Sequence, residues 1–213
     1  VALTSQDNLT WTGSYSVAAG LDGPASIAVW GKDLPGKSGS GTASFTVDSV
    51  APSNTSLASA THPENTPTSR SAAVFSWTPS SDPGTGLAGY SYALNHTAGY
   101  ALDTATDTAA VSLSTALPDG TWWLHLRAVD NAGNGSGTAG YKFIVDVTSP
   151  VYAAYFSRNP ANAGPLSVTL DAGEVLTGAP AVTVKQLGGA TVPMTMTSSN
   201  NISWTVTYAV AAG

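Results

Sequence analysis

The chain has 213 residues, of which 42% are hydrophobic and 9% charged, and thirteen acidic against seven basic residues give it a formal net charge of −6. The hydrophobic content excludes a charged disordered tail, and the scattered basic residues argue against nucleic-acid binding, which needs a clustered basic face. The absence of cysteine excludes disulfides, thiolate metal sites and cysteine nucleophiles.

Short segments that alternate apolar and polar residues follow one another along the chain, and turn signals such as Asp22-Gly23 and Pro118-Asp119-Gly120 separate them. In chain order the predicted strands cover residues 9–17, 26–32, 42–48, 72–78, 89–94, 109–114, 121–129, 140–145, 166–170, 181–186 and 202–210. No helical periodicity of sufficient length interrupts them, and no apolar run is long enough to span a membrane. We therefore predict an all-β fold without a membrane span.

One predicted strand, residues 121–129, shows the two faces of a sheet clearly. Its even positions are apolar and are expected to lie in the core, since successive side chains of a strand point to opposite faces. The odd positions form a candidate contact surface: Trp123, His125 and Arg127. Local packing with a cation–π contact is the favoured interpretation of this trio, and stacking of the tryptophan on a carbohydrate is a further alternative.

Two internal repeats run through the sequence. Asp22-Gly23, Asp33, Phe45 and Asp48 recur 97 or 98 residues later as Asp119-Gly120, Asp130, Phe143 and Asp146. Residues 1–20 also align without gaps on residues 194–213, with 10 of 20 positions identical. The second spacing is 193 residues, which equals one module of 98 residues and one of 95. Both spacings therefore fit modules near the ~100 residues of a β-sandwich.

These repeats predict one complete module and two partial ones. Residues 1–48 would be the C-terminal part of a module, residues 49–146 a complete module, and residues 147–213 the N-terminal part of another. A half sandwich leaves strand edges unpaired and an apolar face uncovered. We therefore expect the partial modules to be completed either by a longer polypeptide or by strand donation from a neighbouring chain.

The central module resembles known bacterial proteins. The runs 74–78, 86–92 and 119–134, together with the joint segments 47–52 and 145–150, are similar to the immunoglobulin-like and fibronectin type III-like tandem modules of large bacterial surface or secreted proteins. The resemblance implies tandem β-sandwiches in an extracellular or cell-surface protein of the adhesin, surface-layer or filament type. It specifies a scaffold more than an activity, since sandwiches host unrelated functions.

Oxygen-bearing side chains gather near the predicted module joints. The loop that contains Asp130, Asn131 and Asn134, with Asp146 after the next strand, suggests a calcium site at one pole of the central module. Asp33 and Asp48 are the candidates at the other joint, and the resembling adhesin arrays often hold calcium at such joints. Turn capping by the same side chains is the alternative that the low acid content favours.

No catalytic pattern is present. The three histidines, His62, His96 and His125, lack metal-ligand spacing, and the sequence has no nucleophile elbow, zinc-protease, P-loop or dinucleotide motif. We therefore expect a protein that is not an enzyme. Five sequons are candidate glycosylation sites if the source organism glycosylates secreted proteins: Asn8, Asn54, Asn95, Asn134 and Asn201.

Together these features predict a structural repeat region that acts as a stalk, spacer or building block of a surface array. Its expected partners are other copies of itself or neighbouring modules, joined laterally or end to end. The alternative is an accessory carbohydrate-binding region of a secreted polysaccharide-degrading enzyme.

Overall fold

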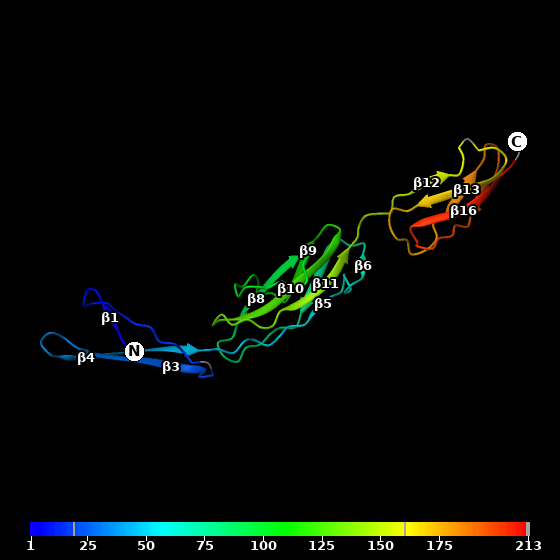
Figure 1. Ribbon diagram of the computed structural model, residues 1–213. Coiled ribbons are helices and arrows are strands. Elements are labelled where there is room, and N and C mark those ends of the chain that lie inside the picture. Colours follow the sequence, from blue (N-terminus) through cyan, green and yellow to red (C-terminus); the bar gives the residue numbers. More distant parts are fainter. Residues whose placement is uncertain (19, 160, 212–213) are drawn as a thin grey trace. The chain divides into compact units, whose positions relative to one another are not determined.

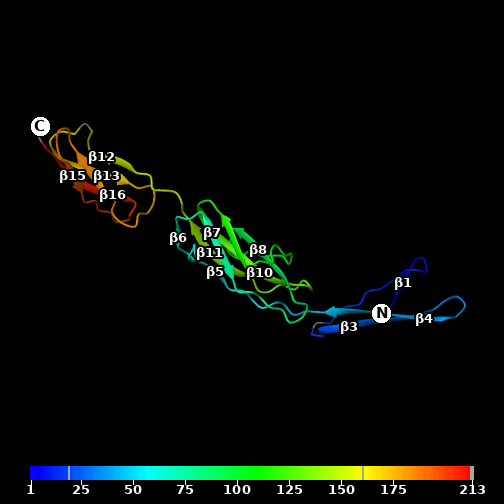
Figure 2. The same cartoon turned by 180° about the vertical axis from the view of Figure 1, so that it is seen from behind.

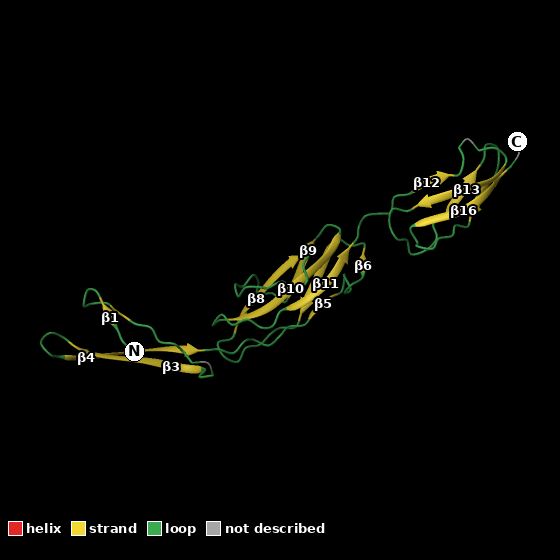
Figure 3. Ribbon diagram, in the orientation of Figure 1, coloured by secondary structure: helices red, strands yellow, loops and turns green. Residues whose placement is uncertain are grey.

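The structure, a computed structural model, consists of strands, turns and loops, and it describes residues 1–18, 20–159 and 161–211. Figure 3 shows strands and loops throughout these residues, which confirms the all-β prediction. None of the described residues belongs to a helix long and apolar enough to cross a membrane. The chain divides into two compact units, Val1–Val147 and Thr148–Gly213.

The described strands range from two to eleven residues in length. Their bounds are β1 Thr4–Ser5, β2 Trp11–Thr12, β3 Gly23–Lys32, β4 Ser38–Val47, β5 Leu57–Ser59, β6 Pro67–Thr68, β7 Ala72–Trp77, β8 Leu87–Asn95, β9 Ser112–Ala116, β10 Gly120–Asp130, β11 Ala139–Val145, β12 Ala153–Phe156, β13 Gly164–Asp171, β14 Val182–Lys185, β15 Thr191–Met194 and β16 Ser203–Val210 (Figure 1).

Residues 49–146, the central region, form two sheets with two neighbouring apolar clusters between them. A four-stranded sheet has the order β6-β11-β10-β8, and a three-stranded sheet has the order β5-β7-β9 (Figures 1 and 2). Phe75 of β7 packs against Leu124 of β10 and Phe143 of β11, so the two sheets face each other across these side chains. Edge-on aromatic contacts such as Phe75 with Phe143, at 4.9 Å between ring centroids, add to the apolar burial.

The N-terminal part of the first unit is a long hairpin. Strands β3 and β4 pair in register from Gly23 opposite Val47 to Lys32 opposite Ser38. The turn between them is closed by Asp33, whose Oδ1 accepts a hydrogen bond from the Lys37 amide at 2.6 Å. Below, "the hairpin" means β3–β4.

The second unit contains one three-stranded sheet, β12-β13-β16, and one two-stranded sheet, β14-β15. Its small core consists of Leu170, Met196 and Trp204, with Val182 of β14 packed against it. Pairing of β13 with β16 extends over eight residue pairs, from Gly164 opposite Val210 to Asp171 opposite Ser203.

One predicted strand is largely wrong. Residues 9–17 alternate like a strand, yet only Trp11–Thr12 is one in the structure, paired with Thr4–Ser5. No described strand pairs with residues 13–18. Alternation shows that a segment can form a strand, but a strand also needs a neighbour to accept its backbone hydrogen bonds.

Candidate metal site

The best candidate site is a cluster of three carboxylates inside the first unit. Asp48 follows β4 directly, Asp82 lies in the loop between β7 and β8, and Asp130 is the last residue of β10. One carboxylate oxygen of each residue lies within 4.8 Å of the others. Below, "the acidic cluster" means these three residues.

Asp48 is held by the loop that follows Asp82. The Thr85 amide and the Thr85 hydroxyl both donate hydrogen bonds to Asp48 Oδ2 at 2.7 Å. These bonds stabilise the charged carboxylate and lower the pKa of Asp48 below its usual value. A side chain at position 84 would overlap this carboxylate, so the close approach of Asp48 requires Gly84.

Asp130 is buried and anchors its own loop. Its Oδ1 accepts hydrogen bonds from the amides of Ala132 and Asn134 at 2.9 and 2.8 Å, and its Oδ2 accepts one from Asn134 Nδ2 at 2.7 Å. This is the turn capping that the sequence favoured. Capping does not exclude a metal ligand, because each carboxylate oxygen has two lone pairs.

Asp82 is the residue that distinguishes the cluster from ordinary turn capping. Its Oδ2 accepts hydrogen bonds from the amides of Gly84 and Gly86 at 3.0 and 2.8 Å. Its Oδ1 is buried and, among the described residues, has no hydrogen-bond partner. An uncompensated buried carboxylate oxygen is costly, and a cation would satisfy it. The three carboxylates supply hard oxygen ligands of the kind that calcium binds.

The two asparagines of the predicted site serve as braces. Asn131 Nδ2 donates to the carbonyl oxygens of Thr85 and Gly86 at 2.8 and 3.1 Å. Asn134 Nδ2 donates to the carbonyl oxygen of Asp48 at 3.1 Å. Both amide groups therefore fix the loops and the joint around the acidic cluster.

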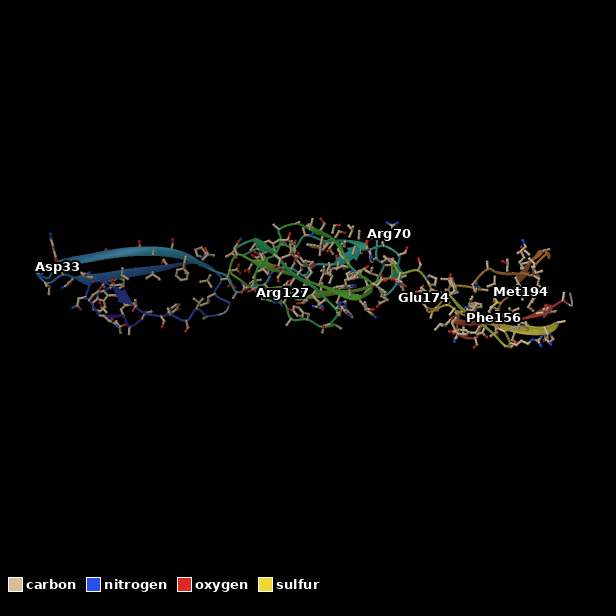
Figure 4. The ribbon with its side chains drawn as sticks, turned by 90° about the horizontal axis from the view of Figure 1, so that it is seen from above. Asp33, Arg70, Arg127, Phe156, Glu174 and Met194 are labelled. Carbon is tan, nitrogen blue, oxygen red and sulfur yellow. The ribbon has the colours of Figure 1, made fainter. Side chains whose placement is uncertain are left out.

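The predicted grouping of the aspartates is wrong in two places. Asp146 follows β11, whose last residue lies opposite Gly120, so Asp146 and Asp130 are at opposite ends of β10. Asp33 lies at the turn of the hairpin (Figure 4). Asp48 follows Val47 at the opposite end of the hairpin. Sequence order suggested these pairs, whereas antiparallel pairing separates them. Asp48 meets Asp130 instead.

Asp82 was not predicted as a site residue, because Asp82-Pro83-Gly84 has the composition of an ordinary turn. A usable signal was present in the glycines that follow. Gly84 leaves room for the carboxylate of Asp48, and Gly86 has a positive φ of 82°. A loop with an aspartate and two nearby glycines is the kind of sequence that lets backbone amides and a second acid approach closely.

The predicted contact surface on β10 is not open. The side chains do point away from the core, but the loop after β8 covers them. His125 is buried and its Nε2 lies 2.9 Å from the Thr97 carbonyl oxygen, while Arg127 Nη1 donates to the Leu102 carbonyl oxygen at 3.0 Å. Trp123 is half-buried and stacks on His125, with 6.1 Å between ring centroids. The trio forms local packing rather than a platform for a carbohydrate ring.

The five sequons differ in accessibility. Asn8, Asn54 and Asn201 are exposed, and Asn95 is half-buried. Asn134 is unsuited to carry a glycan, because the Nδ2 atom that would bear it donates hydrogen bonds to Asp130 Oδ2 and to the Asp48 carbonyl oxygen.

Comparison with known proteins gives no assignment: no protein-family model matches the chain, and no curated protein matches it. The function proposed below therefore depends on the residues and geometry of this chain and on the resemblance noted in its sequence.

Proposed function

We propose that the chain is a structural segment of tandem immunoglobulin-like sandwich modules in an extracellular or cell-surface protein, where it acts as a spacer or building block. The two facing sheets of the central region and the 97- to 98-residue spacing of matching aspartates and glycines support this proposal. In such a protein the stiffness of the joints between modules is decisive, because it sets whether the modules form a rigid rod or a flexible chain.

The observation that carries the proposal is the bracing of the joint after the hairpin. Asp48 is bonded to Thr85, and Asn134 Nδ2 donates to the Asp48 carbonyl oxygen. Pro52 is buried, and the amide of Ser53 donates to the Ser81 carbonyl oxygen at 2.9 Å. A linker fixed by side-chain and backbone contacts over several residues transmits orientation, as a spacer must.

Relaxation measurements by nuclear magnetic resonance test this rigidity. The hairpin and the central region should tumble with one rotational correlation time in the intact chain. Asn134→Ala should partly separate the two times, since it removes the amide that bridges Asp130 to the joint. Asn95→Ala is a matched control, because the Asn95 side chain serves its own loop, where Oδ1 accepts a hydrogen bond from the Thr97 amide at 2.9 Å. Independent tumbling of the two parts in the unaltered chain would overturn the spacer role.

A divalent cation such as calcium is proposed to reinforce the same joint. Asp48, Asp82 and Asp130 would hold it, and the buried Asp82 Oδ1 would gain the partner that the described residues do not provide. The cation would neutralise three neighbouring negative charges and tie the end of β4 to two loops of the central region. It would supply charge compensation and stiffness, with no chemical step.

Thermal unfolding with calcium or with a chelator tests the cation. Calcium should raise the melting temperature of the first unit. At a free calcium concentration of one hundred times the dissociation constant, the stabilisation should be about 2.7 kcal/mol. Asp82→Asn should abolish the response, and Asp33→Asn, at the far end of the hairpin, should leave it intact. Equal melting temperatures in calcium and chelator would show that the acidic cluster is only a set of turn caps.

A further inference from the structure

The hairpin exposes side chains that are buried at the matching positions of the central region. The shift of 97 residues matches Ile27 with Leu124, and the shift of 98 residues matches Phe45 with Phe143. Ile27 is 54% exposed and Leu124 0%, while Phe45 is 39% exposed and Phe143 0%. The register also agrees, since Ala25 lies opposite Phe45 as Trp122 lies opposite Phe143. The hairpin therefore has the inner face of a complete module without its cover.

In the central region that cover is the sheet β5-β7-β9. Phe75 of β7 packs on Leu124, Phe143 and Val145, which belong to β10 and β11. On the hairpin, residues of the segment 1–12 lie against part of the corresponding face, where Leu3, Leu9 and Trp11 line a groove with Val29. Leu3, Leu9 and Trp11 all remain well exposed. The apolar face of the hairpin is consequently still largely open to solvent.

The second unit has the sheet that the hairpin lacks. Its strand order, β12-β13-β16, is equivalent to the order β5-β7-β9. In each sheet the strand that comes second along the chain lies in the middle, between two antiparallel neighbours. Phe156 of β12 pairs with Val168, so both point to the same face of this sheet. Val168 is 5% exposed but Phe156 is 51% exposed, and Figure 4 labels Phe156 on the second unit. The described residues of this unit include no counterpart of β10–β11 to cover it.

The sequence repeat supports the pairing of these two parts. Residues 194–213 match residues 1–20, and the hairpin is the segment that directly follows residues 1–20. The 66 residues of Thr148–Gly213 and the 28 residues 21–48 together come close to the repeat spacing of 98 residues. In length, strand order and exposed faces, the second unit and the hairpin match the two halves of one module.

We propose that the hairpin of one copy of this chain packs on the open face of β12-β13-β16 in a second copy. Phe45 would then cover Phe156. Strand β3 would pair with the edge of β14 that no described strand occupies, as β10 pairs with β8. Each copy presents the hairpin at one site and the receiving sheet, β12-β13-β16, at another, so the contact is heterologous. Head-to-tail association then adds further copies, as an open chain or a closed ring.

The size and chemistry of the two faces fit such a contact. A ten-residue antiparallel pair has a face of about 34 Å by about 10 Å, so two matched faces cover roughly 700 Å² before side-chain relief and edge pairing are added. This approaches the roughly 1,000 Å² of a specific interface. The inward positions from Ala25 to Val29 and from Ala43 to Val47 carry no charge. Association should therefore persist at high salt.

The inference extends the building-block role and does not depend on the braced joint or on calcium. Sedimentation velocity over a series of concentrations tests it on the whole chain, with the mass of 21.4 kDa as the reference for a monomer. The mass should rise with concentration past that of a dimer. A chain that stays at 21.4 kDa overturns the inference and leaves the spacer role untouched.

Two complementary variants make the test specific. Phe45→Asp damages the hairpin face and leaves the receiving sheet intact, whereas Phe156→Asp does the reverse. Each variant alone should be monomeric, and an equimolar mixture should form dimers that grow no further, because only one productive contact remains. Ser44→Asp, on the opposite face of the hairpin, should assemble like the unaltered chain. Larger assemblies from either Phe variant alone, or no dimer in the mixture, contradict head-to-tail docking.

A completed chain separates the second copy from a covering segment within the same polypeptide. Residues 21–48 are added after Gly213, so that the receiving sheet is covered in cis. Assembly should disappear and the second unit should become more resistant to denaturant. If the unaltered chain is monomeric and only the added segment stabilises the second unit, the cover is supplied within one polypeptide and the proposed partner is wrong.

Discussion

Residues 1–20 and 194–213 are two copies of one repeated segment, identical at 10 of 20 positions, in two different surroundings. In the second unit Trp204 is 5% exposed and is the second residue of an eight-residue strand paired with β13. In the first unit the matching Trp11 is 55% exposed, and its strand is two residues long. The difference shows that the strand depends on a partner. Where β13 is present the segment pairs with it, and no described strand takes that position beside residues 13–18.

The turns at the start of the two segments are the same. Asn8 and Asn201 both have a φ of 57°. The amide of Asn8 donates to Ser5 Oγ at 2.9 Å, and the amide of Asn201 donates to Ser198 Oγ at 3.0 Å. The side chains at positions 7 and 200 accept further backbone amides in both copies. Local side-chain to backbone bonds therefore set the turn, whether or not the strand that follows is formed.

The largest contrast is expected from the two matching tryptophans. Trp204→Ala removes a core side chain of the small second unit and should cost about 3–5 kcal/mol, enough to unfold it. Trp11→Ala removes an exposed side chain and should change stability by no more than about 0.5 kcal/mol. Denaturant unfolding followed by circular dichroism measures both. Similar losses for the two variants would mean that residues 1–20 already contribute to a folded core.

Supplying the missing partner should remove the contrast. A chain with residues 148–193 joined directly before Val1 gives residues 1–20 the strands that precede their counterpart. Residues 13–17 should then gain protection in hydrogen exchange, and Trp11 fluorescence should shift to the blue. The same extension with Val168→Asp in the added segment is the control, since the charged side chain should disrupt the packing of the added strand that is meant to pair with residues 13–17. Unchanged exchange in the extended chain would show that an adjacent partner strand is not what residues 13–17 lack.

The asparagines with positive φ allow a smaller test. Asn201→Ala should destabilise the second unit by about 1 kcal/mol, because alanine tolerates the left-handed region less well than asparagine does. Asn201→Gly should restore most of the loss. The same pair of changes at Asn8 should leave global unfolding unaltered, as this turn is not followed by a packed strand. A large effect at Asn8 would contradict that interpretation.

The smallest expected effect is the loss of the hydrogen bonds to the Asp7 carboxylate at low pH. Backbone hydrogen bonds from the amides of Thr10 and then Leu9 lower the pKa of Asp7 from 3.8 to about 2. A lowered pKa means that the stabilisation of the turn is present above 3.8 and is lost as pH falls through about 2. The amide shift of Thr10 should report that loss. The Ser203 amide, bonded to Asn200 Oδ1, should show no matching transition because an amide does not titrate. A midpoint near 3.8 for Thr10 would show that the bonds are absent in solution.

Much of the fold was accessible from residue patterns. Alternation identified β10 and the face of Leu124 and Leu126 that lies in the core, because successive side chains of a regular strand point to opposite faces. It did not identify β5, β6 or β12, which are two to four residues long and carry no usable period. The site was only partly accessible. Asp48 and Asp130 were named, but the carboxylate that completes the acidic cluster, Asp82, comes from a loop that no spacing linked to them.

The sequence by itself determined the all-β class, the inward and outward faces of the longer strands, and the turns around Asn8 and Asn201. These depend on interactions within a few residues. The tertiary structure alone decided which aspartates meet, whether His125 is covered, and whether the repeated segment becomes the strand β16 or stays largely unpaired. Those outcomes depend on groups far apart in the chain, because a strand, a buried side chain or a set of metal ligands exists only when a second segment supplies its other half.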